Sequence, residues 1–378
     1  MKICLGDLWL KKYKRLKILQ IIQRSQLRGA EIFACQLAEQ LQQKGHEVDM
    51  LVLFGEKSKV FDFPLRFHFL EANEKKRWWD VDGYHRLNQF IRSGNYDIVQ
   101  ANAGDTLKYA SLSKKIFRWK STLVFRNANK ISDFLNSAGK KIIYQWLMAS
   151  VDYVASVSHN CMLDFLSIFP SFENRIANLP IGVKENTACA YPSLREIGIN
   201  GSGPFVLHVA GFMPEKNHAG LLRIFKNVLP EFPDAKLLLI GEGKLRPNIE
   251  ALAQEMKMDN SVVFLGKRND VQSIMGACQV LVLPSFIEGL PGVILEAFSN
   301  RLPVIAYDAG GIKEVLFSGK TGWLMKQGNE KAFTTTMIDC LKNNNPFITD
   351  NAYRLIQEKY TIRRVAQDFE EAYGCALK

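Results

Sequence analysis

Short apolar segments rich in Ile, Leu and Val alternate along the chain with longer segments of helical period. The first unit begins with the apolar run Lys17–Ile22, passes a loop that carries Gly29, and continues from about residue 30 to residue 44. In that second segment apolar residues recur every four positions, as on one face of a helix. A strand followed by an amphipathic helix is typical of a parallel sheet with crossover helices. The pattern therefore predicts an α/β fold.

The same unit repeats in both halves of the chain. Further strands are expected in the first half at Glu47–Phe54, Tyr96–Ala101, Ser121–Phe125 and Tyr153–Val157. In the second half they are expected at Phe205–Ala210, Lys236–Ile240, Val262–Leu265, Val280–Leu283 and Val304–Tyr307. A stretch rich in polar and turn residues, 184–204, separates the halves and is typical of a linker. We expect two Rossmann-like domains, residues 1–185 and 186–360, that enclose a cleft at the carboxyl ends of both sheets.

The composition fits two globular domains. The chain has 378 residues, 47% of them apolar, and no apolar run approaches the roughly 20 residues of a membrane-spanning helix. The seven cysteines are widely spaced and form no Cys-x-x-Cys pair, which argues against a disulfide framework and against a zinc cluster. We expect a protein of the reducing cytoplasm that holds no metal.

Positive charge is concentrated in the first half of the chain. Residues 1–185 carry 28 Lys and Arg against 18 Asp and Glu, which accounts for +10 of the formal net charge of +11. This balance points to a polyanionic partner, such as nucleic acid, an anionic membrane or a phosphorylated acceptor. Tryptophan stands beside basic residues at 9–17, 75–79 and 114–120. Because this combination suits a membrane surface and no nucleic-acid-reading module is visible, we expect contact with an anionic membrane and none with nucleic acid.

The densest chemical signal is the stretch EGLPGVILEAF, residues 288–298, which follows an expected strand. Its two glutamates, Glu288 and Glu296, are separated by seven residues. The glycines near its start let backbone amides approach a ligand closely. The helix expected to follow presents unpaired N–H groups and the positive end of its dipole, which suit a diphosphate. Since glutamates accept hydrogen bonds from vicinal hydroxyls, the whole stretch fits a sugar nucleotide.

This stretch resembles the glutamate-seven-glutamate motif of glycosyltransferase family 4, the retaining glycosyltransferases of the GT-B fold. The resemblance covers nearly the whole chain and is strongest over residues 205–325. It implies two Rossmann-like domains facing across a cleft, with the donor bound to the second. It also implies that the last segment, 361–378, forms a helix that crosses back onto the first domain.

The resemblance implies a role for each matching residue. Glu288 would contact hydroxyls of the donor sugar, and Glu296 would hold the ribose. Lys216, in VAGFMPEKNH, would neutralise the leaving diphosphate. The other positions implied for donor binding are Gly29, Gly211, Gly241, Lys267, Arg268, Gly289, Leu290, Pro291, Gly292 and Val293.

The chain departs from the family pattern at two places. Phe212 stands where the family usually has an arginine, four residues before Lys216, so one positive partner of the leaving group is missing or comes from elsewhere. Arg126 and Asn127 stand where the family tends to carry a histidine. Retaining members are thought to need little enzymatic base, because the departing phosphate takes the acceptor proton. On that view Arg126 would act by stabilising the diphosphate or by binding an anionic acceptor.

We expect a retaining glycosyltransferase without metal or cofactor, whose co-substrate is a nucleoside-diphosphate sugar, with a UDP-sugar favoured. Its expected acceptor is lipid-linked or an oligosaccharide, as in surface polysaccharide or lipopolysaccharide synthesis, and its expected place is the inner face of the cytoplasmic membrane. Two alternatives stay open, a nucleotide-sugar 2-epimerase and a non-catalytic partner subunit. Asp80-Val81-Asp82 matches the Asp-x-Asp pattern of metal-dependent glycosyltransferases, but no strand precedes it, and we interpret the match as chance.

Overall fold

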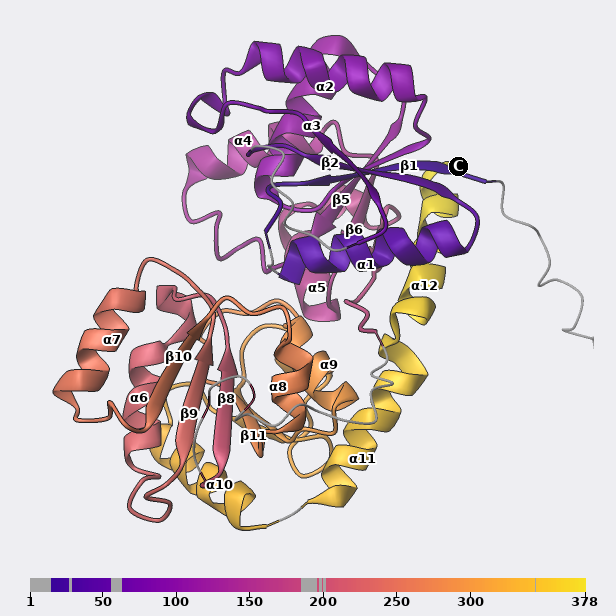
Figure 1. Cartoon of the computed structure of the whole chain (residues 1–378). Coiled ribbons are helices and arrows are strands. Elements are labelled where there is room, and N and C mark those ends of the chain that lie inside the picture. Colours follow the sequence, from indigo (N-terminus) through magenta and orange to yellow (C-terminus); the bar gives the residue numbers. More distant parts are fainter. Residues whose placement is uncertain are drawn as a thin grey trace, which may run out of the picture.

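The computed structural model describes residues 15–26, 29–55, 63–184, 196, 199, 202–343 and 345–378, which form two α/β domains (Figure 1). The first domain holds a seven-stranded parallel sheet of order β3-β2-β1-β4-β5-β6-β7. Its strands are β1 (Lys17–Ile22), β2 (Glu47–Val52), β3 (Arg66–Phe69), β4 (Ile98–Ala101), β5 (Thr122–Asn127), β6 (Tyr153–Ser156) and β7 (Ile176–Asn178). Its helices are α1 (Gly29–Gln43), α2 (Val81–Gly94), α3 (Gly104–Phe117), α4 (Ala138–Met148) and α5 (His159–Ile168).

The second domain repeats this design with a six-stranded parallel sheet of order β10-β9-β8-β11-β12-β13. Its strands are β8 (Phe205–Val209), β9 (Lys236–Ile240), β10 (Val262–Gly266), β11 (Val280–Leu283), β12 (Val304–Tyr307) and β13 (Trp323–Met325). Its helices are α6 (His218–Lys226), α7 (Arg246–Glu255), α8 (Val271–Gly276), α9 (Gly292–Ser299), α10 (Glu330–Lys342) and α11 (Pro346–Leu355). The predicted α/β fold of two Rossmann-like domains is therefore confirmed.

Successive strand residues supply a core on each face of each sheet. In β1, Ile18 packs into one cluster of buried side chains and Leu19 into another. In β8, Val206 and Leu207 divide in the same way. Because both faces are covered, these strands are mostly apolar, with the buried Gln20 and His208 as exceptions, which is why the sequence pattern locates them so well.

The order of strands reverses once in each sheet. In the first sheet β1 lies between β2 and β4, and in the second β8 lies between β9 and β11. The loops that leave the carboxyl ends of the central pair diverge at such a point and open a crevice where ligands bind. Segments that follow strands of one sheet contact segments that follow strands of the other, so the two crevices face each other.

The last helix, α12 (Ile362–Ala376), returns from the second domain to the first (Figure 1). It packs against α1, where the ring centroids of Phe369 and Phe33 lie 5.8 Å apart. Its Glu370 accepts a hydrogen bond from Lys44 at 2.8 Å and lies 3.0 Å from the His46 ring. The end of the chain is thus part of the first domain's core.

A closed ring of four buried side chains fixes α12 to the first sheet. Gln20 donates to the hydroxyl of Tyr373, which donates to Gln100 at 2.6 Å. Gln100 donates to Asn102, whose amide donates back to Gln20 at 2.8 Å. Every member both donates and accepts, so these buried polar groups are satisfied by one another.

Three strands were not expected from the sequence. These are β3, β7 and β13, which have three or four residues each and lie at sheet edges. Most of their side chains are only partly buried, so their apolar pattern is too weak and too short to be read. Most of the expected linker, 184–204, lies outside the described residues.

The tryptophans of the basic clusters differ in exposure. Trp119 is only 3% exposed and donates to Ser113, so the cluster 114–120 presents no tryptophan to a membrane, contrary to expectation. Trp79 is 83% exposed, whereas Trp9 and most of its basic neighbours lie outside the described residues. In the described part of the chain, no helix combines the length and apolar character needed to cross a bilayer.

Candidate active site between the domains

Two charged side chains meet at the strand-order reversal of the second sheet. Lys216 ends a 3₁₀ turn that follows β8, and Glu288 lies in the loop after β11. Nζ of Lys216 lies 2.7 Å from Oε1 of Glu288, which is 8% exposed. The two loops are also joined by backbone, because the amide of Phe286 donates to the carbonyl of Glu215 at 2.8 Å. The ion pair is therefore held where a ligand of this fold binds.

Gly289 and Gly310 bring three segments into direct contact. A Cβ on Gly289 would lie 2.1 Å from the carbonyl oxygen of Ala128, which follows β5 of the other domain. A Cβ on Gly310, whose φ is +56°, would lie 1.7 Å from the carbonyl oxygen of Glu288. Neither position accepts a larger residue unless the backbone moves. Gly289, expected to present its amide to the donor, thus also permits the close contact between the domains.

The first turn of α9 is open to an anion. The helix begins at Gly292, and its N-cap residue, Pro291, makes no capping hydrogen bond with its side chain. Unpaired N–H groups and the helix dipole favour a phosphate at such a place. Gly292 leaves room as well, because a Cβ there would meet only Ile181, at 3.7 Å.

Glu296 lies one turn into α9, and its side chain is half-buried. Burial raises the pKa of its carboxyl to about 7. Near neutral pH the acid and the carboxylate are then both well populated. A ribose whose hydroxyls donate to the carboxylate would stabilise the ionised form and lower this pKa.

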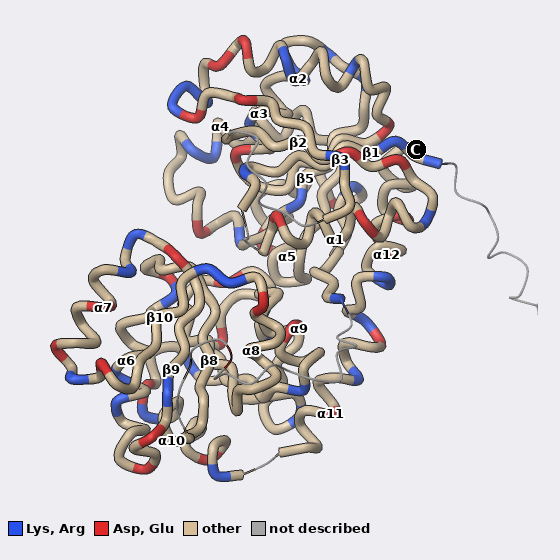
Figure 2. The backbone as a smooth tube through the Cα atoms, in the orientation of Figure 1, with Lys and Arg blue, Asp and Glu red and all other residues tan. Residues whose placement is uncertain are grey.

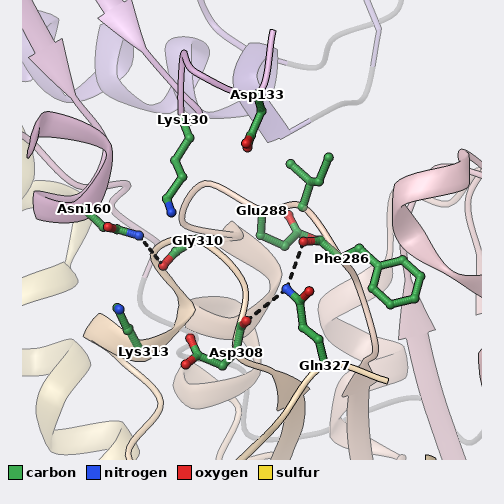
Figure 3. Close-up of a pocket in the computed structure, with 10 residues that line it drawn as sticks. Lys130, Asp133, Asn160, Phe286, Glu288, Asp308, Gly310, Lys313 and Gln327 are labelled. Atoms are coloured by element: carbon green, nitrogen blue, oxygen red, sulfur yellow. Dashed lines mark hydrogen bonds between the residues drawn. The ribbon is translucent and has the colours of Figure 1, made fainter. Parts of the chain in front are cut away.

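A pocket of about 300 Å³ lies beside Glu288, with walls from both domains (Figure 3). Lys130 and Asp133 extend into it from the loop after β5, opposite Gly310 and Lys313 of the second domain. The other lining residues are Asn160, Phe286, Ile287, Asp308 and Gln327. Ammonium, carboxylate and amide groups converge here, which suits a ligand that carries many hydroxyls.

The same region carries the hydrogen bonds that join the domains. The carboxylate of Glu314 accepts from the backbone amides of His159 and Asn160, each at 2.8 Å, at the start of α5. The side chain of Asn160 in turn donates to the carbonyl of Gly310 at 2.8 Å. A carboxylate at a helix N-terminus is favoured by the dipole. The domains are therefore held together immediately beside the pocket.

Arg126 lies inside the first domain rather than on the wall of this pocket. It is 1% exposed, and its guanidinium lies 4.3 Å from the centroid of the Phe33 ring of α1. Its Nε and Nη1 have no hydrogen-bond partner among the described residues. Burial lowers its pKa to about 10, and the nearby carboxylate of Glu31 opposes that change. A ligand could reach this guanidinium only if the packing around it changed.

Phe212 is a core residue. It is 1% exposed and stacks on His218 with ring centroids 4.2 Å apart. Burial lowers the pKa of His218 to about 2 and that of the neighbouring His208 to about 4, so both rings are neutral. An arginine at position 212 would place its charge among these rings, and the chain has an apolar side chain there instead.

The other expected donor residues lie at carboxyl ends of strands. Gly241, with φ of +144°, donates its amide to the carbonyl of Gly266 at 2.8 Å, so the loops after β9 and β10 meet.

Lys267, which follows Gly266, is exposed, and Arg268 is held in a two-point ion pair by Asp270 at 2.8 and 2.5 Å. Gly211 lies after β8, and a Cβ there would lie 3.4 Å from the carbonyl oxygen of Glu242. Gly29 begins α1, and a Cβ there would meet no atom of the described residues within 4 Å.

Asp80 has a structural role. Its carboxylate caps α2 by accepting from Gly83, and it also accepts from the amide of Asn73 and the hydroxyl of Tyr109. These contacts account for a buried aspartate at this position without any ligand.

Among the residues that line the pocket, only Glu288 was predicted as a site residue; the polar side chains of Lys130, Asp133, Asn160, Lys313 and Gln327 were not anticipated from the sequence. Lys130 and Asp133 follow β5, and the other three follow β6, β12 and β13. For the residues after β5, β6 and β12, the position just after an expected strand was the available signal, whereas β13, before Gln327, was itself not expected.

Comparison with known proteins agrees with this architecture. Residues 27–186 match the model of glycosyltransferase family 4, and residues 193–360 match that of the glycosyl transferases group 1. The chain is 22% identical over 370 residues to N-acetyl-alpha-D-glucosaminyl L-malate synthase of Bacillus anthracis, covering 93% of this chain and 94% of that protein. It is 24% identical over 230 residues, 59% of this chain and 61% of the other, to an N-acetylgalactosamine-N,N'-diacetylbacillosaminyl-diphospho-undecaprenol 4-alpha-N-acetylgalactosaminyltransferase of Campylobacter jejuni.

Among solved structures, Anabaena HepE in complex with UDP and glucose is similar, with a TM-score of 0.80 and 19% identity, covering 94% of this chain and 99% of that one. Two facing Rossmann-like domains, together with the matches of both halves, define the class as a glycosyltransferase of the GT-B fold. Since both halves match their family models, the chain belongs to glycosyltransferase family 4.

Proposed function

We propose that the protein transfers a sugar from a nucleoside-diphosphate donor, a UDP-sugar in the first instance, to a lipid-linked or oligosaccharide acceptor of surface polysaccharide synthesis. The proposal rests mainly on the ion pair between Lys216 and Glu288, whose Nζ and Oε1 atoms lie 2.7 Å apart at the strand-order reversal of the second sheet. In a sugar nucleotide, hydroxyls that suit a carboxylate lie next to a diphosphate that suits a cation. An ammonium beside a carboxylate matches the chemistry of that junction, which supports the proposal.

The proposed reaction uses few protein groups. The acceptor oxygen bonds to the anomeric carbon, the bond from that carbon to the phosphate oxygen breaks, and the acceptor proton passes to the departing phosphate. Lys216 and the first turn of α9 stabilise the negative charge that develops on the diphosphate. Because positive charge comes from the protein, we propose that no metal ion is needed. Because the phosphate takes the proton, Arg126 and Asn127 at the usual histidine position are compatible with activity.

Retention of configuration is part of the proposal. The Bacillus and Campylobacter relatives are both named for alpha-linked products. Transfer from a donor with an α-linked sugar to an α-linked product keeps the configuration of the anomeric carbon. The acceptor classes in those names differ, malate in one and a diphospho-undecaprenol glycan in the other. The pocket of mixed lysine, carboxylate and amide groups supports the hydroxyl-rich acceptor for this chain.

A donor screen tests the proposal. Thermal unfolding is measured with UDP-, GDP- and ADP-sugars, because a ligand that binds only the folded state raises the melting temperature. The donor that binds is then incubated with lipid-linked and soluble acceptors in the presence of EDTA. We expect release of the nucleoside diphosphate and an α-linked product whose yield EDTA does not change.

Each alternative predicts a different result in the same assay. A non-catalytic partner subunit binds a donor without releasing nucleoside diphosphate with any acceptor. A 2-epimerase converts the donor into its 2-epimer. Dependence of the yield on added divalent cation would contradict the metal-free mechanism.

A further inference from the structure

Helix α4 turns its apolar side outward. Ile142, Ile143 and Trp146 are 64%, 43% and 51% exposed. They are spaced three and four residues apart, which places them on one side of the helix. An amphipathic helix of a soluble domain normally buries such a stripe. Three large apolar side chains exposed on one turn are therefore typical of a surface that binds another molecule.

The opposite side of α4 explains why the helix stays in place. Leu147 and Met148 are 1% and 2% exposed and belong to the core of the first domain. Tyr144 is partly buried and packs against the same core, toward Gly104 at the start of α3. The helix is thus anchored through one face, and its outward face is a stable feature of the surface.

Positive charge surrounds the outward face. Lys140 and Lys141, both exposed, lie in the first turn of α4. Lys115 of α3 places its ammonium 4.8 Å from the centroid of the Trp146 ring. The exposed aliphatic side chains and tryptophan of α4 are thus bordered by two lysines of its own first turn and by one lysine of α3. This composition is that of segments that lie in the headgroup region of anionic bilayers.

A second exposed tryptophan segment flanks α3. Lys108 lies seven residues before Lys115 on that helix and places its ammonium 4.2 Å from the ring centroid of Trp78. Trp79 beside it is the most exposed of the large apolar side chains in the described part of the chain. The two lysines of α3 thus contact tryptophans of two separate segments, and α3 connects them.

We propose that the outward face of α4, formed by Ile142, Ile143 and Trp146 with Lys115, Lys140 and Lys141, inserts into the headgroup region of an anionic membrane. The proposal rests on the proposed function in one respect: a lipid-linked acceptor requires the cleft to lie near a bilayer. The placement fits, because α4 directly follows the loop that carries the pocket residues Lys130 and Asp133. Figure 1 shows α4 at the outer side of the first domain.

The charge distribution argues against a second copy of the chain as the partner. The half of the chain that carries α4 has a net charge of +10, so two such faces repel each other. Figure 2 shows Lys and Arg positions distributed around this domain. An anionic lipid surface has the complementary sign, and its fluid interface accommodates a small apolar wedge without a matching shape.

The test compares vesicle binding of surface variants of the whole protein. Co-sedimentation is measured with vesicles of phosphatidylcholine and phosphatidylglycerol and with phosphatidylcholine alone. The triple variant Ile142→Ser, Ile143→Ser, Trp146→Ser should bind the anionic vesicles at least about tenfold more weakly than the parent protein, since three apolar side chains lose their lipid contact. The matched control, Phe317→Ser with Phe347→Ser, removes exposed apolar side chains of the second domain and should bind like the parent.

Two further measurements separate the possible partners. Brominated lipids should quench tryptophan fluorescence of the parent protein and quench it less in Trp146→Phe. The variant Ile142→Leu, Ile143→Leu should retain binding. Equal binding of the parent and the triple variant overturns the proposal, as does loss of self-association on size exclusion in the triple variant without any vesicle binding.

Failure of this proposal is distinguishable from failure of the proposed function. Donor binding and transfer to a water-soluble acceptor should be unchanged in the triple variant, because α4 does not line the pocket. If the parent protein binds vesicles through α4 but binds no nucleotide sugar, the proposed function is contradicted and the proposal of membrane insertion through α4 is retained.

Discussion

The two domains share a fold but use the carboxyl ends of their central strands differently. In the second domain the loops after β8 and β11 present Lys216 and Glu288 to the cleft. In the first, the polar side chains of β1 and β4, Gln20 and Gln100, are used within the protein to hold Tyr373 of α12. The basic surface and the outward face of α4 also belong to the first domain. One sheet architecture thus holds the proposed catalytic pair in one half, and the proposed docking surface and the packing of α12 in the other.

The largest expected effect concerns Lys216. If the second domain carries the chemistry, Lys216→Ala should lower kcat by about 10²–10³-fold, since a preorganised cation is lost where charge develops. Steady-state kinetics with saturating donor measure this. Lys226→Ala, which removes an exposed lysine of the same domain, serves as the control and should leave kcat unchanged. A change in KM alone would make Lys216 a binding residue.

Glu296 should affect binding rather than turnover. Glu296→Ala should weaken binding of the nucleoside diphosphate by roughly 1.5–3 kcal/mol, the usual cost of losing hydrogen bonds to a charged group. Isothermal titration with UDP checks this directly. Equal affinity in the parent protein and the variant would contradict the assignment of Glu296 to ribose binding.

Arg126 tests whether the first domain takes any part in the reaction. Arg126→Met keeps much of the buried volume, and replacing a poorly paired buried charge in this way should change the free energy of unfolding by no more than about 1 kcal/mol or raise it. If the guanidinium acts on the diphosphate, kcat should fall by about tenfold while stability is kept. Unchanged kcat with unchanged stability would assign Arg126 to packing against Phe33 alone.

The smallest expected effect is a pH dependence from Glu296. Burial raises its pKa from 4.5 to about 7 in the free protein, so its ionised fraction rises roughly tenfold between about pH 6 and pH 8. Affinity for a UDP-sugar, whose phosphates do not titrate in this range, should increase by up to that factor, and Glu296→Gln should remove the increase. The folded protein holds this proton more tightly than the unfolded chain, so the same carboxyl lowers the free energy of unfolding as pH rises from 4.5 to about 7. A flat profile in the parent protein would contradict the raised pKa.

Much of the fold was predictable from the sequence because most strands are buried on both faces. Runs such as Lys17–Ile22 and Val280–Leu283 were located to the residue. The edge strands β3, β7 and β13 were not, since partly exposed strands of three or four residues lack a distinctive apolar pattern. Glu288 and Lys216 were selected because they lie in contiguous motifs, and the structure places them together.

The rest of the cleft could not be predicted in this way. Lys130, Asn160 and Lys313 come from segments far apart in the sequence, and only the strand order brings them to one pocket. The same applies to Arg126, an arginine at the end of an expected strand, which is only 1% exposed in the fold with its guanidinium against Phe33 of α1. The outward face of α4 was also missed, because an amphipathic period does not say which side of a helix meets the core.

The sequence by itself determined the class of fold and the presence of two domains, and it selected the loop proposed to bind the donor, because these depend on local periodicity and on motifs of adjacent residues. Tertiary structure alone decided which side chains share the cleft, which charges are buried and which apolar face remains uncovered. The physical reason is that burial and electrostatic environment depend on contacts between distant segments. Such contacts have no signature within any one segment.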